Sequence, residues 1–275
     1  MSRKNFSIEA LEIRKFLSAA LPASFGKLII PDVESRGNNS VTRQGPVNGD
    51  FSGFPDLTGW QTTGNDFVMA GDFKTIPDGG STQAVISNAQ APTNGPLPVT
   101  ASTVESFLGL RSGALGNKAF NGSAIKQNIT GKAWDSVSFN VDFFTNEATF
   151  GGTGDYGFIS VGFNGKTRAY RVTGKLTATN PLDSNGLASE TGYQKYTILL
   201  PASGTYTIGF GVVNGNGNGA SASDLAVSNV QLNSGPVILP HGDGDGHGDG
   251  HCDGHGDGRD NRGGWNFESD RNVLG

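Results

Sequence analysis

Residues 134–147 read Trp-Asp-Ser-Val-Ser-Phe-Asn-Val-Asp-Phe-Phe-Thr-Asn-Glu. Apolar residues recur at every second position from Val137 to Phe143, and polar residues alternate with them. Such period-two alternation is typical of a β-strand that buries one of its faces. The run ends in a polar Thr-Asn-Glu cluster, which predicts the loop after the strand. The stretch therefore predicts a long strand of a β domain.

The composition favours an all-β protein with many turns. Glycine accounts for 43 of the 275 residues, and 16% of the residues are charged, against roughly 25% in an average soluble domain. Further strand-like runs recur between turn signals, at residues 66–70, 83–87, 123–129, 156–163, 168–172, 193–200, 205–213 and 225–232. This spacing of short strands is typical of an antiparallel β-sandwich or barrel.

The chain is expected to have three parts. Residues 1–45 form an N-terminal extension, with an amphipathic helix at residues 5–21, a short strand at residues 27–30 and a polar linker. Residues 46–233 form the sandwich and include a short helix at residues 100–110, capped by Ser102 or Thr103. Residues 234–275 form a Gly/His/Asp-rich tail that we expect to be disordered.

Charge and residue usage exclude several classes of function. The net charge of −5, without any basic run, argues against nucleic-acid binding, and no apolar run is long enough for a membrane span. The predicted sandwich contains no histidine or cysteine, which argues against serine–histidine and cysteine–histidine catalysis. Acidic residues that could supply a glycosidase pair occur in no distinctive motif; they are Glu105, Asp142, Glu147, Asp155 and Glu190. We therefore expect a protein that is not an enzyme.

Two groups of motifs resemble known families. The opening Asn48-Gly49-Asp50-Phe51 with Gly59-Trp60 is similar to the first strand of galactose-binding-like jelly rolls of the carbohydrate-binding-module type. The stretches 122–125, 143–147, 155–156, 190–194, 204–213 and 229–230 resemble a family of exported bacterial jelly-roll proteins, many of which carry a PEP-CTERM sorting signal. The resemblance covers roughly residues 46–233. It implies an antiparallel jelly-roll β-sandwich and an extracellular or cell-surface setting. The C-terminal Pro-Glu-Pro motif, apolar helix and basic end of that family do not occur, so its usual anchor is not expected.

The same resemblance bears on calcium. In galactose-binding-like modules, an acid near the closing strand often helps to hold a structural calcium with groups from the opening strand. Here Ser228 stands where relatives tend to have an aspartate, which puts that site in doubt. Asp50 and Asp224 remain as possible oxygen ligands.

The tail carries the strongest metal-binding pattern. From His241 it repeats His-Gly-Asp-Gly with small variations, and it holds all four histidines and the single cysteine of the chain. Imidazole and thiolate suit zinc, copper or nickel, whereas carboxylates suit calcium or magnesium. The candidate ligands are His241, Asp243, Asp245, His247, Asp249, His251, Cys252, Asp253, His255 and Asp257. An EF-hand loop that starts at Asp243 does not fit, because its twelfth position would be Gly254 and not an acid. The alternative to a metal-binding tail is a solvated, disordered spacer.

Aromatic and polar residues near strand ends are candidates for sugar contacts, because aromatic faces stack on sugar rings and polar groups bind hydroxyls. The candidates are Trp60, Phe144, Asn146, Glu147, Tyr156 and Tyr193. Phe144 breaks the alternation and is expected to be exposed. For Trp60, the alternative to a sugar contact is a structural position in the core or at its rim. The alternative for Glu147 is a loop acid that accepts hydrogen bonds from backbone amides.

Two functions follow from these patterns. The first is a non-catalytic extracellular module that binds polysaccharide and carries a metal-binding tail. The second is a structural subunit of an extracellular matrix or surface filament that self-associates through its N-terminal segment. In that case the apolar Leu28-Ile29-Ile30 would be the strand added to a neighbouring subunit.

Overall fold

The computed structural model describes residues 27–29, 31, 41–53, 55–70, 82–89, 96–147, 154–174, 176–181, 187–215 and 222–235. The chain divides into two units, 1–237 and 238–275, and all described residues belong to the first. The helix predicted at residues 5–21 and the predicted metal ligands of the tail lie outside the described residues. Among the helices of the described part, none is long and apolar enough to cross a membrane.

One sheet, sheet A, has the strand order β1-β12-β7-β14-β4-β3, and β11 pairs with both β7 and β10. Its strands are β1 Lys27–Ile29, β3 Asn65–Ala70, β4 Thr82–Ser87, β7 Ser136–Thr145, β10 Asn180–Pro181, β11 Ser189–Glu190, β12 Gln194–Leu199 and β14 Ser223–Asn233. Its pairings are antiparallel except that of β1 with β12, which is parallel.

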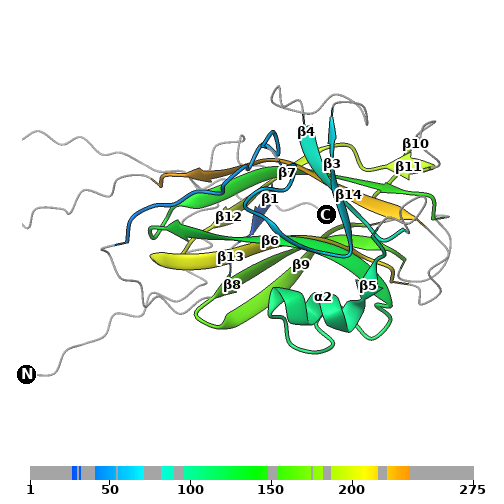
Figure 1. The fold of residues 1–275 in the computed structure, drawn as a ribbon, viewed down its shortest axis with the longest axis horizontal. Coiled ribbons are helices and arrows are strands. Elements are labelled where there is room, and N and C mark those ends of the chain that lie inside the picture. Colours follow the sequence, from blue (N-terminus) through cyan, green and yellow to red (C-terminus); the bar gives the residue numbers. More distant parts are fainter. Residues whose placement is uncertain are drawn as a thin grey trace, which may run out of the picture. The chain divides into compact units, whose positions relative to one another are not determined.

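The other sheet, sheet B, has the order β2-β6-β13-β8-β9, with β5 also paired to β6, and all of its pairings are antiparallel. Its strands are β2 Gln61–Thr63, β5 Val99–Thr100, β6 Asn121–Gly131, β8 Tyr156–Phe163, β9 Lys166–Gly174 and β13 Gly204–Val213. The two sheets face each other, and helix α2 covers the outer side of sheet B (Figure 1). The predicted all-β antiparallel sandwich is therefore confirmed.

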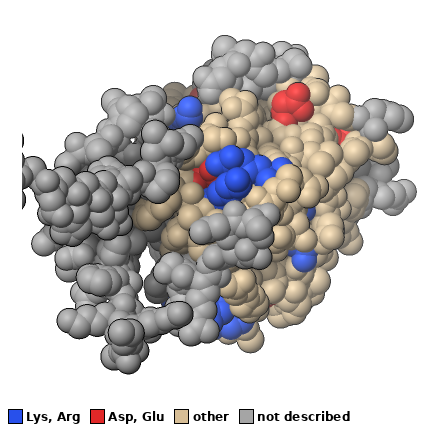
Figure 2. All heavy atoms as spheres, turned by 90° about the vertical axis from the view of Figure 1, so that its left-hand side faces the viewer, with Lys and Arg blue, Asp and Glu red and all other residues tan. Residues whose placement is uncertain are grey.

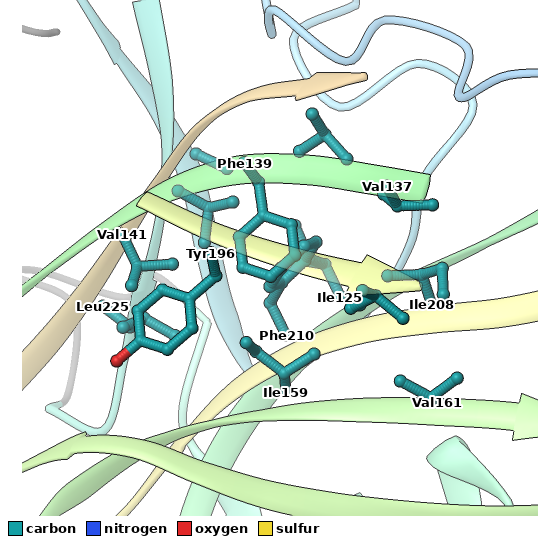
Figure 3. Close-up of a cluster of buried hydrophobic side chains, with 14 of the residues drawn as sticks. Ile125, Val137, Phe139, Val141, Ile159, Val161, Tyr196, Ile208, Phe210 and Leu225 are labelled. Atoms are coloured by element: carbon teal, nitrogen blue, oxygen red, sulfur yellow. The ribbon is translucent and has the colours of Figure 1, made fainter. Parts of the chain in front are cut away.

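The core lies between the sheets and is built from alternate residues of the central strands. Val137, Phe139 and Val141 of β7 are buried, as their alternation predicts, and they meet Ile208 and Phe210 of β13 (Figure 3). The rings of Phe139 and Phe210 meet edge to face, with 4.9 Å between their centroids. Because each such side chain contributes about 1.5–3 kcal/mol when it is fully buried, this central cluster dominates the stability of the sandwich.

Helix α2, Ala101–Leu108, is the predicted short helix, and its N-cap is Thr100 rather than Ser102 or Thr103. The Thr100 hydroxyl accepts a hydrogen bond from the Thr103 amide, and the helix ends at Gly109 in the left-handed conformation. Glycines on β13 leave room for the side chains that lie over it. A Cβ on Gly209 would lie 2.7 Å from Leu108 Cδ2 of the helix, and a Cβ on Gly211 would collide with the Phe158 ring of β8.

The N-terminal part of the described chain is tied to the sandwich. The predicted strand at residues 27–30 is confirmed for Lys27–Ile29, which pairs in parallel with Tyr196–Ile198 of the same chain. Gln44 forms a bridge with Thr130, so the docked chain begins before residue 46, where the sandwich was expected to start.

Arg43 anchors this segment through an ion pair with Asp135, at 2.7 Å between Nε and Oδ2 and 2.9 Å between Nη2 and Oδ1. Burial alone would raise the pKa of Asp135, but hydrogen bonds from Arg43, Gly235 and Lys132 lower it below its ordinary value. Figure 2 shows one face of the molecule, where a central group of Lys and Arg side chains lies beside an acidic one. Other charged side chains are scattered over this face, and most of the remaining described surface is uncharged. The low charge content of the sequence is thus visible on this face.

Candidate functional site

A cavity of about 360 Å³ lies between the outer face of sheet B and the loop that follows α2. It is lined by Ala114, Leu115, Gly116, Asn117, Lys118, Ala119, Tyr156, Phe158, Ala169, Arg171 and Gly215. Many of these residues are small, so the backbone approaches closely and the larger side chains determine the chemistry of the cavity.

The floor of the cavity is formed by neighbouring strands β8 and β9. Tyr156 and Phe158 come from β8, with their rings in an edge contact at 6.3 Å between centroids. Arg171 of β9 lies over the Tyr156 ring, with its guanidinium carbon 4.5 Å from the ring centroid. The register of the two strands shifts at Gly157 and Phe158, and such irregularities re-aim side chains beside functional sites. Burial raises the pKa of Tyr156 to about 12, so its hydroxyl stays neutral.

The roof of the cavity is held in place by a buried carboxylate. Glu105 of α2 is 5% exposed, and its two oxygens accept hydrogen bonds from the amides of Gly113 and Leu115, each at 2.9 Å. The Leu115 carbonyl in turn accepts a hydrogen bond from the Tyr156 hydroxyl. Helix, loop and floor are therefore linked in one chain of hydrogen bonds, and the cavity is preformed.

A second buried carboxylate fixes the wall at Gly215. Asp155 accepts hydrogen bonds from the Gly215 amide at 3.2 Å, from the Asn88 side-chain amide at 2.7 Å and from the Ser223 hydroxyl at 2.8 Å. Burial raises the pKa of Asp155, although the bonds from Asn88 and Ser223 oppose this. Glu147 accepts a hydrogen bond from the Asp155 amide at 2.7 Å, which confirms the alternative interpretation of Glu147 as a loop acid that binds backbone amides.

The outer face of sheet A carries a polar cluster whose acids are buried. The Tyr193 hydroxyl donates to Gln83 of β4. Tyr193 directly precedes β12, and β7 and β14 lie between β12 and β4. The Tyr193 side chain therefore has to cross both of these strands to reach Gln83. Asp142 of β7 and Glu190 of β11 are both buried here, at 1% and 3% exposed.

Burial, reinforced by Glu190, raises the pKa of Asp142 to about 7. Its Oδ1 accepts a hydrogen bond from the Thr191 hydroxyl at 3.0 Å, whereas Gln83 Nε2 and Ser228 Oγ have no hydrogen-bond partner. Of the five acids considered for a glycosidase pair, the structure brings Asp142 and Glu190 together. Both are buried in a polar cluster and do not face an open cleft.

Most of the sugar-contact residues expected from the sequence do not line the cavity. Trp60 is 7% exposed, and its indole donates to the Asn48 carbonyl at 3.1 Å inside the core. The expectation that Phe144 is exposed is wrong: it is 1% exposed, because β11 pairs with β7 and Leu187 packs against the ring. The side-chain oxygen of Asn146 accepts from the Ala222 amide at 2.8 Å. Of the expected residues, Tyr156 lines the cavity.

The two aspartates considered for calcium lie in different places. The exposed Asp50 accepts hydrogen bonds from the amide and hydroxyl of Ser52, in a turn that meets β14 at Val230. Asp224 pairs with Ser87 and Phe144 near the start of β14. A strand advances about 3.3 Å per residue, so the way from Asp224 to Val230 spans about 20 Å, and the two carboxylates are not brought together.

Within the described ranges, no group of three or more His, Cys, Asp or Glu residues is placed so that it could hold a metal ion. Calcium in the sandwich and zinc, copper or nickel in the tail stay predictions.

Sequence reasoning missed Asn117, Lys118 and Arg171. Asn117 and Lys118 follow a helix in a loop without any motif, and their place over β8 depends on the Glu105 hydrogen bonds. A signal for Arg171 does exist in the alternation of β9, where Tyr170 and Val172 pack against the core. Arg171 therefore belongs to the outer face, and the pairing of β9 with β8 brings it beside Tyr156.

No family model matches the sequence, and the comparison with curated proteins found no match. Among solved structures, the chain is similar to the carbohydrate-binding module TmCBM61 in complex with β-1,4-galactotriose, at 13% identity over 70% of this chain and 98% of that one, with a TM-score of 0.36. It is also similar to the K1 cleaved adhesin domain of Lys-gingipain from Porphyromonas gingivalis W83, at 9% identity over 68% and 95% of the two chains, with a TM-score of 0.37. A third is the family 11 carbohydrate-binding module from Clostridium thermocellum in complex with a β-1,3-1,4-mixed-linked tetrasaccharide, at 12% identity over 71% and 98%, with a TM-score of 0.33. At such low identities and TM-scores, no ligand or residue role carries over to this chain.

Proposed function

We propose that the sandwich is a non-catalytic carbohydrate-binding module and that the cavity over sheet B is its sugar site. The observation that carries the proposal is a preformed hollow with an aromatic floor at Tyr156 and hydrogen-bond donors at Asn117, Lys118 and Arg171. Its volume of about 360 Å³ lies at the lower end of the range for small-molecule sites, which suits one or two sugar rings.

A binding role is favoured over hydrolysis because the acids around the cavity are already engaged. Glu105 and Asp155 both accept hydrogen bonds from backbone amides that hold the cavity walls. A glycosidase needs two carboxyl groups that flank a substrate bond, about 5–10 Å apart. The other close pair, Asp142 and Glu190, is buried under Tyr193 on the opposite sheet.

The test is a glycan array followed by titration calorimetry on the best glycan. Replacing Tyr156 with alanine should weaken binding at least about tenfold, equivalent to about 1.4 kcal/mol, whereas phenylalanine should retain part of the affinity because the ring remains. Thr207→Ala is the matched control, since Thr207 is on sheet B, bonds to Asn128 in an exposed position and does not line the cavity. Equal affinities for Tyr156→Ala and the control would refute this site.

The proposal includes an extracellular or cell-surface location, in line with the family resemblance in the sequence. Detection of the protein in the culture medium, compared with a cytoplasmic marker, tests it. The metal-binding tail is proposed alongside: calorimetry with zinc and with calcium should give heats that disappear when residues 241–258 are deleted. Unchanged heats after the deletion would contradict it.

A second candidate function is self-association by strand exchange, as in a matrix or filament subunit. The favouring observation is the three-residue β1, which adds in parallel to an edge of sheet A and lies far in sequence from its partner β12. A neighbouring copy could supply the same strand. Size-exclusion chromatography of the full chain and of a chain starting at Val41 tests this, and two monomers would exclude it.

A further inference from the structure

We propose that the sugar bound in this cavity is acidic, with a carboxylate or sulfate group that Arg171 and Lys118 bind. This inference rests on the proposed function and adds the class of ligand.

The charged side chains that line the cavity are both positive. Arg171 and Lys118 both line it, in a chain whose net charge is −5. The acidic side chains that support its walls are Glu105 and Asp155, and the oxygens of both accept hydrogen bonds from inside the protein. A bound anion would therefore meet two cations, while the nearby carboxylates are turned to the protein interior.

The guanidinium of Arg171 is positioned by the fold. Its carbon lies 4.5 Å from the centroid of the Tyr156 ring, and its Nη2 lies close to Gly174 of the same strand. Any Cβ at Gly174 would lie 2.6 Å from Arg171 Nη2, so glycine leaves the space that the guanidinium occupies. A guanidinium carries a planar fork of donors, and this geometry matches a carboxylate or sulfate group.

The opposite rim of the cavity supplies the second charge. Asn117 and Lys118 are exposed on the loop whose path is set by the Glu105 bonds to Gly113 and Leu115. Their amide and ammonium groups are thus presented across the cavity from the strand that carries Arg171. An acidic sugar ring between them would have Tyr156 as an apolar surface and donors on two sides.

The experiment is titration calorimetry of the full chain with a panel of uronate trisaccharides, each paired with its carboxyl-reduced form, and of sulfated trisaccharides paired with their desulfated forms. Acetate and inorganic sulfate are titrated separately. We expect at least about tenfold tighter binding of one acidic class than of its neutral partner, and a smaller preference at high salt, because salt screens exposed charges. The class that is preferred, uronate or sulfate, identifies the anionic group.

Four variants locate the preference. Arg171→Gln and Lys118→Gln should each weaken binding of the acidic form more than binding of the neutral form, so that the acidic-over-neutral ratio falls several-fold. Gly174→Ala should reduce the same ratio by displacing the guanidinium without a change of charge. Arg168→Gln is the matched control on the same strand, because Arg168 does not line the cavity.

Equal binding of acidic and neutral forms, or a preference that survives Arg171→Gln, would overturn the inference and leave the sugar site standing. The inference also fails if the free anions bind as tightly as the acidic sugars. If none of the glycans binds, in the panel or on the array, the proposed function itself fails.

Discussion

Replacement of Asp142 with asparagine should stabilise the sandwich at neutral and alkaline pH. The carboxyl is buried beside Glu190, and its pKa is raised from 3.8 to about 7 in the folded protein. The charged form is therefore less favourable in the folded state than in the unfolded chain. Asparagine keeps a side-chain oxygen that can accept from Thr191 and carries no charge at any pH.

The sign and size follow from the difference between the two pKa values. The folded state binds the proton more tightly, so stability is greatest below about pH 4 and falls as the pH rises toward 7. Each pKa unit corresponds to about 1.4 kcal/mol, so the whole loss is about 4 kcal/mol, of which about 3 kcal/mol falls between pH 5 and pH 8. The asparagine variant does not share this loss.

Urea unfolding followed by tryptophan fluorescence at pH 5, 6, 7 and 8 measures the effect. The free energy of unfolding of Asp142→Asn, minus that of the wild type, should increase by about 3 kcal/mol over this range. Asp56→Asn, which makes the same substitution at an exposed position, is the matched control. If the difference for Asp142→Asn is constant with pH, then Asp142 is not desolvated and the buried-acid account of sheet A is wrong.

Three further changes test other parts of the structure. Gly211→Ala should destabilise the protein by about 1–3 kcal/mol in thermal or urea unfolding, because its Cβ collides with Phe158, whereas Gly45→Ala, which meets Leu232 at an ordinary 3.5 Å, should have little effect. Glu105→Gln should cost about 1–3 kcal/mol and weaken sugar binding in calorimetry, since the bonds to Gly113 and Leu115 lose their charge; unchanged affinity would mean that the roof does not depend on them. Asp135→Asn should be less stable than the wild type above about pH 4, and the gap should close as the pH falls, because the lowered pKa of Asp135 makes the Arg43 pair contribute only while the carboxyl is ionised; a gap that persists in acid would contradict this.

The strands were predictable because alternation is a local property of the chain. Residues 136–145 form β7, with Val137, Phe139, Val141 and Phe143 in the core. The short helix expected at residues 100–110 is observed at Ala101–Leu108, although its N-cap is Thr100 and neither of the two expected residues. Phe144 was misjudged for the opposite reason. Its burial depends on Leu187 and β11, more than forty residues further along the chain, and no local pattern contains that contact.

The cavity was only partly predictable from the sequence. An aromatic residue at a strand start singled out Tyr156, but the roof comes from a loop whose position depends on Glu105, a helix residue without a motif. Arg171 becomes visible only once β9 is known to pair with β8. Residues brought together by pairing and loop capping, as here, require the three-dimensional structure.

The parallel strand β1 has a consequence for the order of folding. Lys27 and Tyr196, which share a side-chain hydrogen bond, are 169 residues apart, so their contact closes a very long loop. Closing this loop costs conformational entropy, and only three residues of strand pairing offset that cost. We therefore expect β1 to dock after β12 and β7 have paired. Native-state hydrogen exchange should then find the β1 amides opening at a lower free energy than those of β7 and β13, as an independent unit at the edge of sheet A.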